Sequence, residues 1–291
     1  NLAYAGAFDS FQDFHRARYF YKPANDTQTG LEKIIRYGNQ HQVSKATAGN
    51  TLFGEATMPE IMPPDIPDCE TWDLTTMLEH EKAVTGMFMS GHPLDNFRFE
   101  INNYNITSLA DFNEFKDSGQ KNRGYRLAGL VIDAKHRVTR TGRQFGIFTI
   151  EDFTGKSEFS LWADDYTKYS HYMVPGNILF LTGAFKPRYY NTEEVEFKTE
   201  QIFLLESVKK QLTKEISFTI PASAIKEDWI SFLEEYLTKN PGNTRLVFNI
   251  TDEATQQKTT LRNYEKLITV NDNLAGWIME NREIEYEVLS F

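Results

Sequence analysis

The sequence contains 291 residues, has a formal net charge of −10 at neutral pH, and is 40% hydrophobic. This composition allows two or three folded domains, and it excludes both a disordered chain and a coat that binds nucleic acid over its whole surface. The single cysteine, Cys69, excludes an intramolecular disulfide and is typical of a reducing compartment, so we expect a cytoplasmic protein with no membrane span. Because the chain starts at Asn1 without an initiator methionine, we expect a piece of a larger protein.

The first segment, residues 1–57, is predicted to contain helices and then a linker. Residues 29–45 carry a thin apolar stripe that is typical of a surface helix. Residues 44–58 are mostly small and include one apolar pair, Leu52 and Phe53. Exposed apolar residues in a linker favour a docking peptide, and the alternative is that the pair attaches the linker to its own domain.

The second segment, residues 58–120, combines a connector with helices. Four prolines near its start favour an extended chain. A broad apolar face then predicts a helix over residues 72–90, with Gly91 as its C-terminal cap. Two shorter helices are predicted at residues 94–104 and 108–115.

The third segment, residues 121–207, has the pattern of an oligonucleotide-binding (OB) domain. Runs of apolar residues that alternate with polar ones predict three strands, a short helix with an acidic first turn, and two further strands. This order is typical of a five-stranded OB-fold β-barrel, in which closure of the sheet removes most exposed edges. The predicted strands are 125–133, 144–150, 157–162, 177–183 and 195–205, and the predicted helix is 164–172.

Charge in this segment opposes the charge of the whole chain. Residues 121–144 contain seven Lys or Arg and one acid, a local formal charge of 7 − 1 = +6. Cations in the loops that border the binding face of an OB fold can follow phosphates, and aromatic rings there can stack on bases. A solvated basic hairpin is the alternative. The predicted nucleic-acid-binding residues are Lys135, Arg137, Arg140 and Arg143 around the loop between the first two strands, and Lys186, Arg188, Tyr189 and Tyr190 between the last two.

Three aromatic residues inside the predicted strands, Phe145, Phe148 and Trp162, could either stack on bases or fill the core. Large aromatic side chains dominate protein cores, so we predict core packing for all three. The face on which each side chain lies decides between these interpretations.

The last segment, residues 208–291, is predicted to form a separate α/β domain. Its pattern resembles a split βαβ sheet with helices on one face, which makes the whole chain a multidomain α+β protein. No catalytic constellation is present in this segment, so protein docking is its predicted role. The predicted strands are 216–220, 244–251, 258–261 and 284–289, with 267–270 as a candidate for another, and the predicted helices are 222–238 and 273–280.

Sequence patterns for catalysis and metal binding are incomplete. Gly155-Lys156-Ser157 ends like a P-loop but lacks the first glycine, and His80-Glu81 begins like a helical zinc motif but lacks the second histidine. The six histidines have no ligand spacing. We therefore predict no catalytic residue, metal or cofactor in this chain.

Several motifs follow one another in a recognisable order, and Gly86-Met-Phe-Met-Ser-Gly-His-Pro-Leu94 is the most specific. The others are Ala5-Gly-Ala-Phe-Asp9 followed by Arg16 and Arg18, Leu52-Phe53-Gly54, Leu78-Glu-His-Glu-Lys82 and Ala128-Gly-Leu-Val131. Together they resemble the C-terminal portion of the bacterial DNA polymerase III alpha subunit, over residues 1 to about 206. Residues beyond this range match only in position and pattern.

The resemblance implies a role for each segment. Residues 1–57 would end a helix-hairpin-helix and clamp-binding region, residues 121–207 would hold single-stranded template DNA, and residues 208–291 would contact the clamp-loader tau subunit. Leu52 and Phe53 would anchor in the sliding clamp (beta subunit), although the Gln that usually starts the family's clamp peptide is absent. Nucleotidyl transfer, with its magnesium, would belong to a part of the polymerase outside this chain.

Two other functions fit the same residues. A transfer-RNA anticodon-binding barrel of the class II synthetase type has a similar Gly-Leu-Val start and a similar Glu-Asp-x-x-Gly hairpin, but its enzyme normally continues into a large catalytic domain. The other is a protein-interaction scaffold whose barrel binds no nucleic acid.

Overall fold

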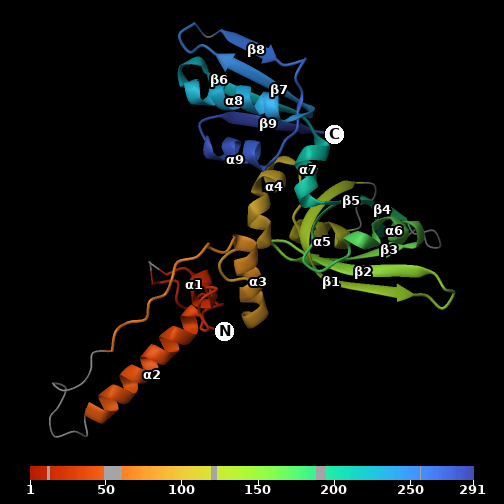
Figure 1. The fold of residues 1–291 in the computed structure, drawn as a ribbon. Coiled ribbons are helices and arrows are strands. Elements are labelled where there is room, and N and C mark those ends of the chain that lie inside the picture. The colour runs from red at the N-terminus through yellow and green to blue at the C-terminus, as the bar shows by residue number, and fades with distance from the viewer. Residues whose placement is uncertain (12–13, 49–60, 119–122, 188–194, 256) are drawn as a thin grey trace. The chain divides into compact units, whose positions relative to one another are not determined.

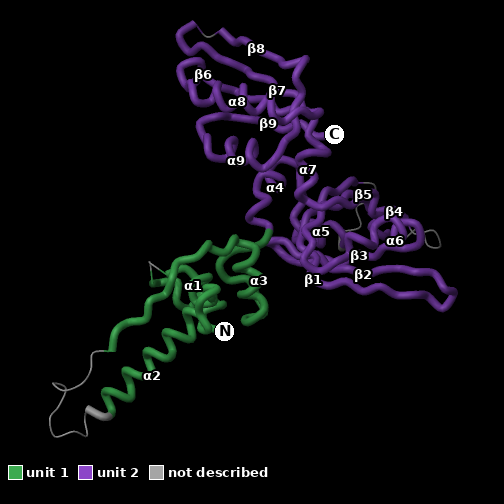
Figure 2. The backbone as a smooth tube through the Cα atoms, viewed as in Figure 1, with its two compact units in different colours: residues 1–93 green, residues 94–291 purple. Residues whose placement is uncertain are grey.

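The structure of the protein is a computed structural model (Figure 1). It describes residues 1–291 except for 12–13, 49–60, 119–122, 188–194 and 256. The chain divides into two compact units, residues 1–93 and 94–291 (Figure 2). The predicted mixed α+β class is confirmed. None of the described helices combines the length and the apolar character that crossing a membrane requires.

In the first unit, the predicted polar helix is present as α2 (Gly30–Ala48), between α1 (Arg16–Phe20) and the later α3. Two reciprocal hydrogen bonds cap the start of α2. The amide of Thr29 donates to the carboxylate of Glu32 at 2.7 Å, and the amide of Glu32 donates to the hydroxyl of Thr29 at 3.4 Å. This capping box satisfies amides that have no partner inside the helix.

The third helix, α3 (Leu74–Thr85), is shorter than the predicted 72–90. It ends at Gly86, which adopts the left-handed conformation with φ of +82°. The prediction that Gly91 caps the helix is therefore wrong. The chain turns back earlier because the carboxylate of Glu81 accepts two backbone amides of the following loop.

The second unit contains a five-stranded antiparallel sheet with the strand order β3-β2-β1-β4-β5. Its strands are β1 (Gly124–Val138), β2 (Gln144–Glu151), β3 (Lys156–Trp162), β4 (Ile178–Pro187) and β5 (Val195–Leu204). All five strands overlap the predicted ranges, and α6 (Ala163–Tyr169) lies between β3 and β4 as predicted. The predicted element order of an OB fold is thus confirmed.

The predicted closure of this sheet is wrong for the residues that the structure describes, because no backbone pairing there joins β3 to β5. Aromatic side chains fill the interior between the two edges instead. The rings of Phe159 on β3 and Phe197 on β5 have centroids 5.5 Å apart. Phe112 of α5 (Leu109–Ser118) stacks on Phe159 at 5.6 Å. Side-chain packing therefore connects edges that the expected barrel would join by hydrogen bonds.

The C-terminal part of this unit is a four-stranded sheet with the order β8-β7-β6-β9. Its strands are β6 (Thr213–Pro221), β7 (Pro241–Thr251), β8 (Lys258–Arg262) and β9 (Glu285–Ser290). The parallel strands β6 and β7 are direct neighbours joined through α8 (Glu227–Lys239), so the predicted split of the βαβ unit is wrong. Phe218 and Phe248 are register partners in this parallel pair, and their rings stack with centroids 5.4 Å apart.

One face of the four-stranded sheet is covered by α8 and α9 (Asp272–Glu280), and the core continues toward the OB sheet. The same buried cluster includes Phe218 of β6, Phe180 of β4 and Phe99 of α4 (Arg98–Asn103). Residues of α7 (Leu205–Leu212), which links β5 to β6, also belong to it. The second unit therefore has a core that both sheets share. Short 3₁₀ segments at Pro93–Phe97, Ser170–Tyr172 and Ala222–Ala224 complete the described elements.

Candidate nucleic-acid interface

The two strands β1 and β2 form a long hairpin that carries three of the predicted arginines (Figure 1). β1 continues beyond its predicted end at residue 133 to Val138, so Arg137 lies on the strand and the prediction that it lies in the loop is wrong. Arg140 and Arg143 lie in the turn between the strands. All three side chains are exposed, and among the described residues none of the three takes part in an ion pair.

The register of the sheet aligns Arg137 with two aromatic side chains. Arg137 on β1 is opposite Phe145 on β2, and Phe145 is opposite Trp162 on β3. Cross-strand partners lie on the same face of a sheet. The rings of Phe145 and Trp162 stack with centroids 4.4 Å apart and planes 5° from parallel, and Trp162 is 46% exposed. We call these three residues the cation–aromatic row.

This geometry tests the prediction that the strand aromatics face the core. For Phe148, which is 1% exposed, the prediction is confirmed. For Phe145 and Trp162 it is wrong, because both side chains lie on the outer face of the sheet. The sequence contained a signal for Trp162, since along β3 it alternates with Phe159 and Leu161 and shares the face of the polar residues Glu158 and Ser160.

Local contacts fix the orientation of Trp162. Its indole Nε1 donates to Oγ of Ser160 at 3.0 Å. The next residue, Ala163, has φ of +48°, a left-handed conformation that costs a non-glycine residue roughly 1–2 kcal/mol. Such a conformation persists only where the surrounding structure imposes it. The ring therefore lies at a sharp, well-defined corner between β3 and α6.

Charge changes along the same face of the sheet. In the next row Lys135 is opposite Ile147, and in the row beyond it Asp133 is opposite Thr149. Nζ of Lys135 lies 2.6 Å from a carboxylate oxygen of Asp133. A hydrogen bond from Lys135 lowers the pKa of Asp133, so this carboxylate stays charged. The positive charge of Lys135 is thus balanced locally, and the unbalanced cations gather at the end of the hairpin.

The second predicted group of cations is placed differently. Lys186 lies on β4, so the prediction that it belongs to a loop is wrong, and its Nζ is 2.9 Å from a carboxylate oxygen of Glu200. β4 pairs with β1 from Gly124 to Leu130, whereas Arg137 lies near the other end of β1. The structure therefore does not bring Lys186 together with the cation–aromatic row. The remaining predicted residues, Arg188, Tyr189, Tyr190, Leu52 and Phe53, lie outside the described residues.

One arginine of the basic segment has another role. Arg126 is half-buried and donates to Oγ of Ser290 at 2.7 Å and to the carbonyl oxygen of Phe291 at 2.6 Å. It also donates to the carbonyl oxygen of Tyr104 at 3.3 Å. The local charge of +6 in the sequence is therefore divided between the hairpin and a contact with the C-terminal sheet.

Comparison with known families adds to this geometry. Residues 125–205 match the family model described as an OB-fold nucleic acid binding domain. Residues 216–289 match the model described as the DNA polymerase III alpha subunit, C-terminal domain. The chain is related to the C-terminal portion of the DNA polymerase III alpha subunit. The family predicted from the sequence motifs is thus confirmed.

Individual alpha subunits are similar over most of this chain. That of Escherichia coli O157:H7 is 29% identical over 185 residues, which are 62% of this chain and 15% of the relative. That of Vibrio cholerae is 24% identical over 244 residues, 84% of this chain and 20% of the relative. The chain thus spans at most a fifth of these alpha subunits. Among solved structures, the second OB-fold domain of replication protein A from Methanococcus maripaludis is 21% identical and covers 30% of this chain and 87% of that domain, with a TM-score of 0.21.

Proposed function

We propose that this portion of the alpha subunit binds single-stranded template DNA on the outer face of its OB sheet. The observation that carries the proposal is the cation–aromatic row, Arg137, Phe145 and Trp162, on a domain that matches a nucleic-acid-binding family. An exposed stacked pair of rings offers a flat surface to a base, and each base stacked on an aromatic side chain contributes roughly 1–3 kcal/mol.

The same row favours single strands over duplexes. Bases inside a duplex are already stacked on their neighbours, so only an unpaired base can lie on Trp162. Arg137, Arg140 and Arg143 would hold the phosphates next to that base. Because the whole chain carries a net charge of −10, distant parts of the surface repel the strand and restrict binding to this end of the sheet.

Replacing Arg137, Arg140 and Arg143 together with alanine is expected to weaken binding of a labelled oligothymidylate and to reduce its salt dependence. Loss of three phosphate contacts lowers the slope of log K against log salt by about 2 for a single strand. Fluorescence anisotropy at several salt concentrations measures both effects. The matched control replaces three exposed lysines on other elements, Lys210, Lys214 and Lys266. Equal affinity of the arginine variant and the parent protein would favour the scaffold function, and tighter binding of transfer RNA would favour the anticodon function.

Trp162→Ala is expected to weaken oligothymidylate binding by a factor of about 5 to 150, which corresponds to loss of one stacked base. The salt slope should stay the same, because no phosphate contact is removed. Quenching of tryptophan fluorescence by the bound strand gives an independent measurement in the parent protein. Trp277→Phe, a change in the core of the C-terminal domain, is the control for effects on the fold. If Trp162→Ala changed the salt slope and not the affinity, base stacking would be excluded.

We further propose that the chain tethers the polymerase to the sliding clamp through Leu52 and Phe53, and to the clamp-loader tau subunit through residues 208–291. The relation to alpha subunits and the apolar pair in the sequence support this proposal. Joining several weak sites in one chain raises their effective concentration, so modest affinities can hold the enzyme on DNA.

The double replacement Leu52→Ala and Phe53→Ala is expected to abolish capture of the sliding clamp while leaving oligothymidylate binding unchanged. Loss of two apolar anchors removes the burial that would hold the peptide in a clamp pocket. A pull-down with purified clamp measures the effect, and the alanine variant of Leu2, an exposed leucine elsewhere in the unit, is the control. Undiminished capture by the double variant would exclude this peptide as the clamp site.

A further inference from the structure

The strand β8 (Lys258–Arg262) is an exposed edge of the C-terminal sheet. Among the described strands it pairs with β7 alone, and all five of its residues are exposed. It contains no proline or glycine, and its central residues are Thr259, Thr260 and Leu261. An edge of this kind offers a row of backbone amides and carbonyls to another extended chain.

The register separates the side chains of β8 onto two faces with different chemistry. Thr260 is opposite Asn249 of β7 and lies on the outer face of the sheet, which we call the open face. Its hydroxyl donates to the Asn249 side chain at 2.8 Å. Lys258 and Arg262 share this face by the alternation of the strand. Leu261 is opposite Phe248 and therefore lies on the other face. Toward the central strands, α8 and α9 cover this face.

The apolar layer of the sheet is incomplete at this edge. Leu261 is 52% exposed, and Phe248 and Ile250, which face the core, are only half-buried. In contrast, Phe218 on the central strand β6 is fully buried. One more strand beside β8 would cover these apolar residues on one face and place its other side chains next to Lys258 and Arg262.

We propose that β8 binds an extended acidic peptide segment of a partner protein by strand addition. Acidic side chains of the segment would lie beside Lys258 and Arg262 on the open face, and alternating aliphatic side chains would cover Leu261 on the other face. The partner motif is therefore an alternation of Asp or Glu with aliphatic residues. This inference rests on the docking function proposed for residues 208–291, and gives that function a specific surface and ligand chemistry.

Peptide is favoured over nucleic acid by the arrangement of this edge. Main-chain hydrogen bonds in register require amides and carbonyls at the spacing of a β-strand, which a polypeptide supplies and a phosphate backbone does not. The exposed Leu261 also lies on the face opposite Lys258 and Arg262, where an aliphatic side chain is the matching group. Lys and Arg at an edge can also act simply to prevent aggregation, and the experiment below separates that role from binding.

The experiment titrates the full chain with a labelled peptide of alternating Glu and Val and follows fluorescence anisotropy. The double variant Lys258→Glu and Arg262→Glu is expected to weaken binding of this peptide by about tenfold or more. The same variant should bind a peptide of alternating Lys and Val more tightly than the parent protein does. The charge-matched control, Lys210→Glu with Lys266→Glu, should leave both affinities unchanged.

Two N-methylated forms of the Glu–Val peptide test the backbone pairing without changing the protein. Methylating every second amide blocks one edge of the peptide, so one form should lose binding and the other should retain it. Equal binding by both forms, or no binding by the unmodified peptide, would overturn the proposal, as would a larger effect of the Lys258 and Arg262 replacements on oligothymidylate than on the peptide. Capture of the tau subunit is measured in parallel. Undiminished capture by a chain that fails the peptide tests would reject the β8 site and leave the docking function in place.

Discussion

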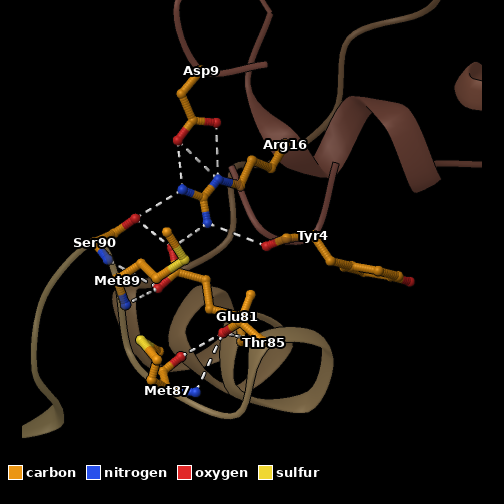
Figure 3. A network of polar contacts seen from close by, with 8 residues as sticks. All are labelled: Tyr4, Asp9, Arg16, Glu81, Thr85, Met87, Met89 and Ser90. Carbon is orange, nitrogen blue, oxygen red and sulfur yellow. Dashed lines mark hydrogen bonds and ion pairs between the residues drawn. The ribbon is translucent and has the colours of Figure 1, made fainter. Parts of the chain in front are cut away.

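Replacing Glu81 with glutamine is expected to lower the local free energy of unfolding of α3 by about 3 kcal/mol, since the buried guanidinium of Arg16 loses its buried counterion. Glu81 is fully buried and Arg16 is 6% exposed. Nη1 of Arg16 lies 2.6 Å from Oε1 of Glu81 (Figure 3). Loss of the Glu81 charge would leave the guanidinium with Asp9, at the partly exposed end of the network, as its counterion.

The network around this pair joins three parts of the first unit (Figure 3). Arg16 donates through Nε to Asp9 at 2.9 Å and through Nη2 to the hydroxyl of Ser90 at 2.8 Å. Glu81 accepts the backbone amides of Met89 at 2.8 Å and Ser90 at 2.9 Å. One carboxylate accepts from two amides, one hydroxyl and one guanidinium. A glutamine has a single acceptor oxygen and a donating amide group, so it cannot satisfy all of these donors.

The pKa of Glu81 gives this prediction a pH dependence. Burial alone would raise this pKa, but hydrogen bonds from Ser90, Arg16 and the amide of Met89 outweigh burial and lower it from 4.5 to about 2. A carboxylate with a lowered pKa stabilises the folded state fully above its unfolded pKa, and this contribution is lost as the pH falls toward the folded value. The stability difference between the parent protein and Glu81→Gln should therefore shrink between pH 4.5 and pH 2.

Hydrogen exchange of peptides that cover α3 and the loop after it measures the local stability in the full chain. Glu79→Gln, an exposed replacement on the same helix, is the matched control and should change exchange by no more than about 0.5 kcal/mol. If Glu81→Gln exchanged like this control at neutral pH, the network would be irrelevant to the stability of the unit.

The motifs that revealed the family converge on this network, a fact that the sequence could not show. Asp9 and Arg16 belong to the first motif, Glu81 to the third, and Ser90 to the longest. The hydrogen-bonded residues are separated by up to 74 positions, between Arg16 and Ser90, and these separations carry no periodicity that would predict contact. Spacing along a chain predicts neighbours on one helix or strand, but a contact between distant segments depends on how the chain returns.

In the OB sheet, by contrast, the sequence predicted most of the elements that the structure contains. Alternation and turn residues predicted all five strands, because each is a local property of a short run. Strand ends were less accurate. β1 continues past residue 133 although, among the described strands, this outer part pairs with β2 alone. Its side chains there are mostly polar and resemble a loop. That extension moved Arg137 from a loop onto the same row as Phe145 and Trp162. The proposed binding face thus depended on register, which sequence alternation alone does not fix.

Glu100→Ala is expected to lower the free energy of unfolding of the second unit by about 3–5 kcal/mol, because it would leave the buried ammonium of Lys209 without its buried counterion. Lys209 and Glu100 are 4% and 2% exposed and form an ion pair between α7 and α4. Asp272 at the start of α9 lies 2.8 Å from the same ammonium, but its side chain is 93% exposed. Burial lowers the pKa of Lys209, and the hydrogen bonds that its ammonium donates to Asp272 and Glu100 outweigh burial and raise it overall. Charged Lys209 therefore contributes stability below the ordinary lysine pKa of 10.5, and this contribution is lost as the pH rises through the raised value. Burial raises the pKa of Glu100 even beside this ammonium, so the ionised carboxylate adds no contribution of its own.

The ion pair of Glu100 and Lys209 joins two helices that pack in the core of both sheets. Loss of this ion pair is therefore expected to destabilise the two sheets together. α4 and α7 carry residues of the core that the OB sheet and the C-terminal sheet share. Urea unfolding followed by far-ultraviolet circular dichroism and by tryptophan fluorescence should show one transition for the second unit of the parent protein, in which Trp162 lies on the OB sheet and Trp229 in the C-terminal domain. In Glu100→Ala both signals should shift to lower urea concentration together.

The double replacement Glu100→Leu and Lys209→Met separates charge from packing. A buried ion pair can often be exchanged for apolar residues of similar volume without loss of stability, since the exchange removes the cost of burying two charges. The double variant should therefore recover most of the stability that Glu100→Ala loses. If it is as unstable as the single variant, the hydrogen bonds and fit around the ion pair hold the two sheets together, and the uncompensated charge of Lys209 is not the cause of the loss.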